Sequence, residues 1–98
     1  MLKISTIDGT DDIVLRIEGK LITPWTMELE SVWQNVIDSL NARRLLLDIR
    51  NTTSIDAGGF ECLARIAQGA KAGILADSPL TRQFADRVQQ MKVSQKER

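Results

Sequence analysis

The sequence predicts a single α/β domain with a mixed four-stranded sheet and the element order β-β-α-β-α-β-α. The chain opens with two alternating apolar and polar runs separated by a turn, which is typical of an antiparallel hairpin. After the hairpin, helical apolar stripes alternate with short apolar runs. This alternation indicates parallel strands joined by right-handed crossovers. The 98 residues, 43% of them hydrophobic, suit one small domain, which we expect over residues 1–91.

The first two predicted strands cover residues 2–7 and 13–19. Apolar and polar residues alternate in both, so each strand is expected to be buried on one face. The turn between them contains Gly9, which can adopt a positive φ. Gly19 is expected to end or bend the second strand.

The clearest helix is predicted over residues 23–41. Thr23 is expected to cap it, with Pro24 in the first helical position. Apolar residues then recur with helical spacing and form one stripe, so both tryptophans are predicted to lie in the core. The stripe consists of Trp25, Leu29, Val32, Trp33, Val36, Ile37 and Leu40.

Residues 43–50 carry an almost uninterrupted apolar run, which predicts a central strand. The polar residues 51–54 that follow are interpreted as a loop. Asp56 then has the position and chemistry of an N-cap for a helix over residues 57–68, with Gly69 closing its end.

A short strand is predicted over residues 71–77, and Ser78 and Pro79 are expected to start the last helix. Residues 92–98 are polar and are expected to form a C-terminal tail. The buried stripe of the last helix is predicted to be Leu80, Phe84, Val88 and Met91.

Composition narrows the functional classes. Thirteen basic and thirteen acidic residues give no net charge, which argues against capture of nucleic acid. No apolar run approaches the roughly 20 residues that cross a bilayer, so we expect no direct membrane insertion. Cys62 is the only cysteine, which indicates a reducing, cytoplasmic setting. We expect its thiol to be inert packing rather than a sensor.

The sequence has no histidine, no Cys/His metal spacing and no phosphate-binding GxxxxGK[ST] loop. The commonest general base and the commonest metal ligand are therefore missing. We expect no enzyme, no metal site and no cofactor.

The segment LLLDIRNTTSIDAGGFECLARI, within this element order, resembles the STAS domain, the fold of bacterial anti-sigma-factor antagonists. That family carries a signature of the form DLSGVTFIDSSGLGVLL. Asp48 and Asp56 correspond to its two aspartates, Gly59 to the glycine that follows and Leu63 to an apolar helix position. RIEGKL, residues 16–21, is similar to the family's LxGeL strand end.

The chain departs from the family at the site of regulation. In phosphoregulated STAS proteins, a serine just before the last glycine of the signature accepts phosphate from a partner kinase. Gly58 occupies that place here and Ala57 precedes it, so neither position offers a hydroxyl. The resemblance thus implies no phosphorylation at the motif position. Thr52, Thr53 and Ser54 lie upstream, where such residues usually make structural hydrogen bonds.

A partner-binding surface is expected at the start of the second helix and the segment before it. The two glycines expose backbone and permit close approach of a partner surface. The helix that follows carries apolar residues on two sides, which is consistent either with complete burial or with an exposed docking face. The expected partner-binding residues are Thr53, Ser54, Asp56, Ala57, Gly58, Gly59 and Phe60.

The resemblance implies a non-catalytic protein-interaction module that regulates a partner by docking. One family branch antagonises a kinase-like anti-sigma factor and so regulates transcription. Another is the small STAS subunit of bacterial lipid-transport ABC complexes, which has DTGG at this site and grips the transporter ATPase. A different alternative is a small-ligand- or nucleotide-sensing domain with its site at a sheet end. The sequence leaves the partner and the oligomeric state open.

Overall fold

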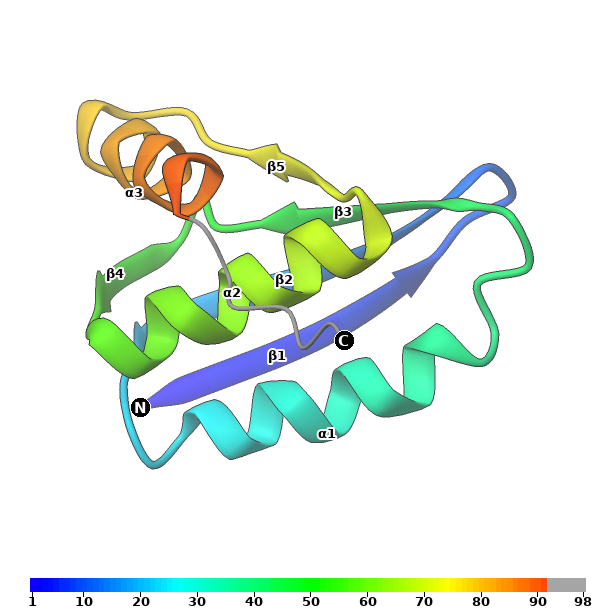
Figure 1. Ribbon diagram of the computed structural model, residues 1–98, viewed down its shortest axis with the longest axis horizontal. Coiled ribbons are helices and arrows are strands. Elements are labelled where there is room, and N and C mark those ends of the chain that lie inside the picture. Colours follow the sequence, from blue (N-terminus) through cyan, green and yellow to red (C-terminus); the bar gives the residue numbers. More distant parts are fainter. Residues whose placement is uncertain (92–98) are drawn as a thin grey trace, which may run out of the picture.

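The computed structural model describes residues 1–91, which form an open mixed sheet with helices α1 and α2 side by side over one face (Figure 1). The α/β class and the order of the predicted elements are confirmed. The elements are β1 (Leu2–Asp8), β2 (Asp12–Leu21), α1 (Thr26–Ile37), β3 (Arg44–Asp48), β4 (Thr52–Ile55), α2 (Ala57–Ala70), β5 (Gly73–Leu75) and α3 (Pro79–Gln90). The predicted tail, residues 92–98, lies outside the described residues.

The sheet has five strands, so the prediction of four was wrong. The strand order is β1-β2-β3-β5. Strand β4 is outside this path and pairs with the part of β2 that extends beyond β3. Only β1 and β2 pair antiparallel, and the other pairings are parallel. The additional strand is β4, which the polar sequence of residues 51–54 disguised as a loop.

The length of β2 explains why β4 forms. Residues Asp12–Arg16 of this ten-residue strand pair with β3, and its last part, from Gly19 to Leu21, is left free to pair with β4. The register shifts between Gly19 and Lys20, where Gly19 has a φ of 95°. Of the two expectations for Gly19, that it ends the strand or that it bends it, the second is confirmed. β4 forms through pairing with a distant strand and needs no apolar run of its own.

Helix α1 is shorter than predicted at both ends. The predicted cap was wrong: Thr23 and Pro24 belong to a turn closed by a hydrogen bond from Trp25 N–H to the Ile22 carbonyl, and the Thr23–Pro24 peptide is cis. Trp25 takes the N-cap position and makes no side-chain capping bond.

Trp33 lies in the core, but the prediction that Trp25 is also buried was wrong, since 49% of Trp25 is exposed. Helical periodicity does not apply to Trp25, because it precedes the first helical residue. Ile37, the last residue of α1, is 46% exposed, so its predicted place in the buried stripe was wrong.

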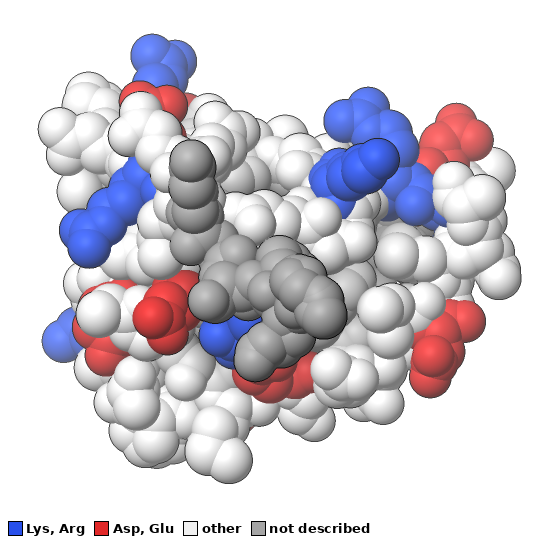
Figure 2. All heavy atoms as spheres, viewed as in Figure 1, with Lys and Arg blue, Asp and Glu red and all other residues white. Residues whose placement is uncertain are grey.

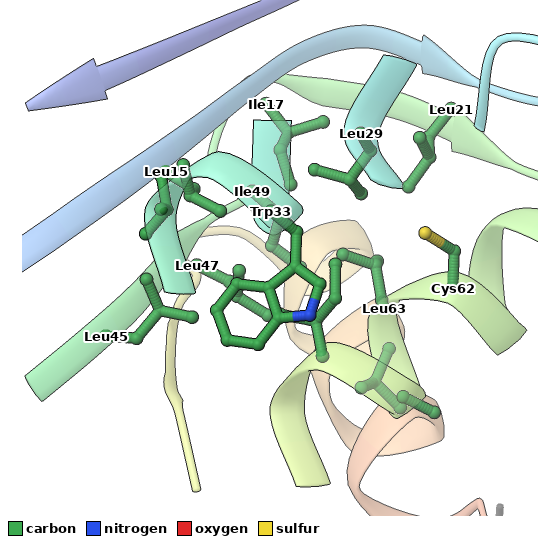
Figure 3. Packing of buried hydrophobic residues seen from close by; sticks show 14 of the residues in the cluster. Leu15, Ile17, Leu21, Leu29, Trp33, Leu45, Leu47, Ile49, Cys62 and Leu63 are labelled. Atoms are coloured by element: carbon green, nitrogen blue, oxygen red, sulfur yellow. The ribbon is translucent and has the colours of Figure 1, made fainter. Parts of the chain in front are cut away.

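The core lies between the sheet and helices α1 and α2, and α3 contributes Val88 to it (Figure 3). Helix α2 packs between α1 and α3 and also contacts β3 and β4. The apolar side chains on both sides of α2 are consequently buried: Phe60, Cys62, Leu63, Ala64 and Ile66. Complete burial is thus the correct alternative for these side chains, and an exposed apolar face on α2 is not.

The predicted ends of α2 and α3 are confirmed in some places and wrong in others. Helix α2 runs through Gly69 and ends at Ala70, with Lys71 in the left-handed conformation, so Gly69 does not close it. Helix α3 begins as predicted at Ser78 and Pro79, with a capping box between Ser78 and Thr81. Val88 is buried as expected, but Leu80, in the first turn of α3, is exposed, so its predicted burial was wrong.

Candidate functional site

Asp56 lies at the junction of β4 and α2 and binds two backbone amides with its carboxylate. Oδ1 accepts a hydrogen bond from Gly59 N–H at 2.8 Å, which confirms the predicted cap of α2. Oδ2 accepts a second bond, also 2.8 Å, from the N–H of Thr23 in the turn before α1. The bond from Thr23 and then that from Gly59 hold the pKa of Asp56 below its usual range. The carboxylate thus joins two loops.

The two glycines after Asp56 are packed against this chain itself. A Cβ at Gly59 would lie 2.3 Å from the Leu21 carbonyl oxygen and 2.8 Å from Cγ2 of Ile55. A Cβ at Gly58 would lie 2.4 Å from the hydroxyl oxygen of Thr23. The close approach expected of a partner is therefore made at Gly59 by β2, so that expectation is corrected there. At Gly58 the neighbour is a side chain that can rotate.

The seven predicted partner-binding residues are adjacent in space, but they differ in accessibility. Thr53 and Ala57 are exposed, while Ser54, Asp56 and Gly58 are half-buried. We call these five residues the β4–α2 corner. Gly59 and Phe60 lie beneath it, because β2 covers the glycine and α3 covers the ring.

Phe60 is only 5% exposed. Its ring makes an edge contact with Phe84, with centroids 5.9 Å apart, and the Arg87 guanidinium carbon lies 4.3 Å from the ring centroid. These contacts between α2 and α3 give the residue a packing role. Direct docking on the Phe60 ring would require α3 to move.

The hydroxyls near the corner differ in their availability. The Thr52 side chain is buried, and its hydroxyl donates a 2.7 Å hydrogen bond to the Ile17 carbonyl. For this residue the structural interpretation is correct, since the bond secures β4 to β2. Thr53, on the opposite face of the strand, is exposed.

Anion binding at the start of α2 is opposed by its own cap. The Gly59 amide is occupied by Asp56 Oδ1, and the Phe60 amide donates to the Asp56 carbonyl. An incoming phosphate would meet the Asp56 carboxylate beside these amides. Among residues 1–91, no group of three or more acidic or cysteine side chains has a geometry that could hold a metal ion.

Asp48, the other aspartate of the STAS-like segment, lies at the end of β3 and is 2% exposed. Arg50 binds it through Nε at 2.9 Å and Nη2 at 3.0 Å, and Arg16, its register partner on β2, lies 3.2 Å away. These bonds, those from Arg50 above all, lower the pKa of Asp48 to about 2. The ion pair between Arg16 and Asp48 connects β2 to β3, so we assign this cluster a structural role.

The Cys62 thiol is buried, and its pKa is raised to about 12, chiefly by burial and further by Glu30. A thiol with so high a pKa carries almost no thiolate at neutral pH. These properties support the prediction that the Cys62 thiol is packed inertly and does not act as a redox sensor.

Sequence reasoning missed an exposed apolar region beside the corner. Met1, Trp25 and Met27 are exposed, and the turn that contains Thr23 connects Trp25 with the corner. Figure 2 shows an uncharged area at the lower left of this face, below a group of acidic side chains. The sequence carried no clear signal for this exposure, because a proline restricts the residue before it and not the residue after it.

No family model matches the chain, and no curated protein matches it. Its fold, however, is found among solved structures. Mglu superposes with a TM-score of 0.61 and 14% identity over 76% of this chain, which spans only 19% of Mglu. No helix in the described part of the chain has the length and apolar character needed to span a membrane.

Two matched structures are similar to this chain over most of their own length. The anti-sigma factor antagonist SpoIIAA in its unphosphorylated form has a TM-score of 0.59 and 12% identity, over 88% of this chain and 82% of SpoIIAA. A protein from the DUF3478 family of Shewanella loihica PV-4, described as having a SpoIIAA-like fold, has a TM-score of 0.57 and 13% identity, over 82% and 71%. The chain therefore has the SpoIIAA-like fold.

Proposed function

We propose that this domain is a non-catalytic protein-interaction module that regulates a partner protein by docking through the β4–α2 corner. The observation that carries the proposal is the pair of bonds from Thr23 and Gly59 to the Asp56 carboxylate. They hold the exposed Ala57 and the half-buried Gly58 in one arrangement before any partner arrives. A surface ordered in advance loses less entropy on binding.

The proposed docking works without phosphorylation at the motif position. Gly58 has no hydroxyl there, and the hydroxyl of Thr52 is buried and bonded within the chain. Control by a partner kinase would need another acceptor. We expect the purified domain to bind its partner with no phosphate attached.

The partner class follows from the resemblance to STAS proteins. SpoIIAA, which has this fold, is an anti-sigma factor antagonist, and a kinase-like anti-sigma factor in the cytoplasm is the first candidate. The second candidate, the ATPase of a lipid-transport ABC complex, is favoured by Gly58, since the STAS subunits of those complexes resemble DTGG at this site. A small-ligand- or nucleotide-sensing site at the sheet end is the third candidate, and a cavity lined by Met1, Leu2, Trp25 and Glu28 opens at that end.

Affinity capture from the native host tests the proposal, with Gly58→Glu as the disrupting variant. A side chain at position 58 meets the Thr23 hydroxyl and adds bulk and charge to the corner. Gly69→Glu is the matched control, because position 69 lies on the same helix, is exposed and has open space around it.

The wild type and Gly69→Glu should retain one specific protein that Gly58→Glu loses. Mass spectrometry then identifies it as a kinase-like protein or a transporter ATPase. Equal recovery by Gly58→Glu, with a native circular dichroism spectrum, would show that docking occurs elsewhere.

A further inference from the structure

A cavity of about 300 Å³ opens between the first residues of β1 and the start of α1. It is lined by Met1, Leu2, Trp25 and Glu28. Trp25 is about half exposed, so its indole forms an accessible wall. Two residues before Trp25, the Thr23 amide is bound to Asp56, so the cavity lies next to the β4–α2 corner.

Three of the four lining side chains are apolar, and Glu28 is the single charged one. No ion pair within residues 1–91 involves Glu28, whereas Asp8, Glu30 and Asp48 each have an arginine partner. Glu28 also lies in the first turn of α1, where the helix dipole favours a carboxylate. That placement stabilises the helix, and among the described residues the carboxylate has no cationic partner.

The cavity combines an indole wall, an aliphatic wall and a carboxylate that has no ion-pair partner within residues 1–91, and together they select one type of ligand. A long aliphatic stem packs against methionine and leucine, while its cationic end meets the carboxylate and the face of the indole. A free carboxylic acid or phosphate would be repelled by Glu28. Lysine and arginine side chains have the stem and the charge that the cavity requires.

We propose that this cavity receives a lysine or arginine side chain of the protein that docks on the β4–α2 corner. The inference rests on the proposed function for the identity of the occupant. The docking surface then extends from the corner across Thr23 to Trp25. The basic side chain anchors the partner at the far end of that surface.

The first experiment measures affinity for the partner recovered by capture, using isothermal titration calorimetry. Trp25→Ala should weaken binding at least tenfold, and Glu28→Gln by about three- to tenfold with a smaller dependence on salt. Ile37→Ala is the matched control, because Ile37 is as exposed as Trp25 (46% against 49%) but lies at the other end of α1. It should change affinity less than twofold.

The second experiment uses the protein alone and the indole N–H signals of its two tryptophans. Nα-acetyl-lysine amide should shift the Trp25 signal saturably in the millimolar range, and the neutral Nε-acetylated analogue should do so much less. Trp33 is buried and provides an internal control. Glu28→Gln should abolish the discrimination between the two probes.

The two experiments separate the possible failures. If Gly58→Glu abolishes partner binding while Trp25→Ala and Glu28→Gln bind like wild type, the cavity proposal is overturned and the proposed function stands. If no partner depends on position 58, the proposed function fails, and the inference, which takes its occupant from that function, fails with it. The same Trp25 shift with both probes, or no saturable shift, overturns the charge-selective site whatever the outcome of capture.

Discussion

Asp56 and Thr23, 33 residues apart in the chain, are joined by a 2.8 Å hydrogen bond from the Thr23 backbone N–H to the Asp56 carboxylate. The same carboxylate caps α2 through Gly59. One side chain therefore sets the position of the turn before α1 relative to the start of α2. The proposed docking corner and the cavity beside Trp25 share this bond as their connection.

Replacing Asp56 with alanine should destabilise the domain and loosen the turn at Thr23. Loss of the cap and of the bond to Thr23 should lower the Tm by about 4–8 °C, the effect of a typical cap deletion in a domain of this size. Asp56→Asn keeps an acceptor oxygen and should lose less. Thermal unfolding followed by circular dichroism measures both, and an unchanged Tm for Asp56→Ala would contradict the role assigned to the carboxylate.

Stability should fall in acid because of Asp48. Its pKa is about 2 in the folded protein, against an ordinary value of 3.8. A lowered folded-state pKa means that the carboxylate stabilises the fold fully above about pH 4, and that this contribution is lost as the pH falls toward 2.

This lowering of the Asp48 pKa corresponds to a contribution on the order of 2 kcal/mol to the free energy of unfolding. Urea unfolding between pH 2 and pH 6 measures it. Asp48→Asn cannot ionise, so its stability should vary less with pH across the same range, and a parallel loss in both proteins would assign the effect to other groups.

Three glycines of α2 should respond differently to substitution by alanine. Gly59→Ala places a Cβ against the Leu21 backbone oxygen and should cost about 1–3 kcal/mol or more. Gly58→Ala meets only the rotatable Thr23 side chain and should cost less. Gly69→Ala has open space and should stabilise by about 0.5–1 kcal/mol. Chemical denaturation ranks the three, and the order 69, 58, 59 from most to least stable is the expected result.

Cys62 should resist alkylation while the domain is folded. Its thiol is buried and its pKa is about 12, so the reactive thiolate is scarce at pH 8. Iodoacetamide labelling followed by mass spectrometry should be at least about 100-fold slower in buffer than in 6 M guanidinium. Comparable rates in both would indicate an accessible thiol and a role beyond packing.

Features that depend on a few neighbouring residues could be predicted from the sequence. The hairpin of β1 and β2, the cap of α2 by Asp56 and the capping box at Ser78 all follow from local hydrogen bonds or from alternation within one strand. The motif position at Gly58 could likewise be located by its spacing from Asp48 and Asp56. These features fixed the fold class and the place of the corner.

Features that depend on distant segments could not be predicted in this way. Strand β4 forms because β2 extends past β3 and offers it a pairing partner. The polar sequence of residues 51–54 does not indicate this distant partner. The glycines looked like an opening for a partner, but Leu21 and Thr23 fill the space, and only the packed chain brings them there.

The sequence by itself determined the α/β class, the order of its predicted elements and the start of α2, because its patterns and caps act over short stretches of chain. The tertiary structure alone decided that Phe60 is covered, that Trp25 is exposed and that Thr23 is bound to Asp56. Each of these outcomes depends on which surface packs against a residue far away in the chain, and that is settled only when the helices and the sheet meet.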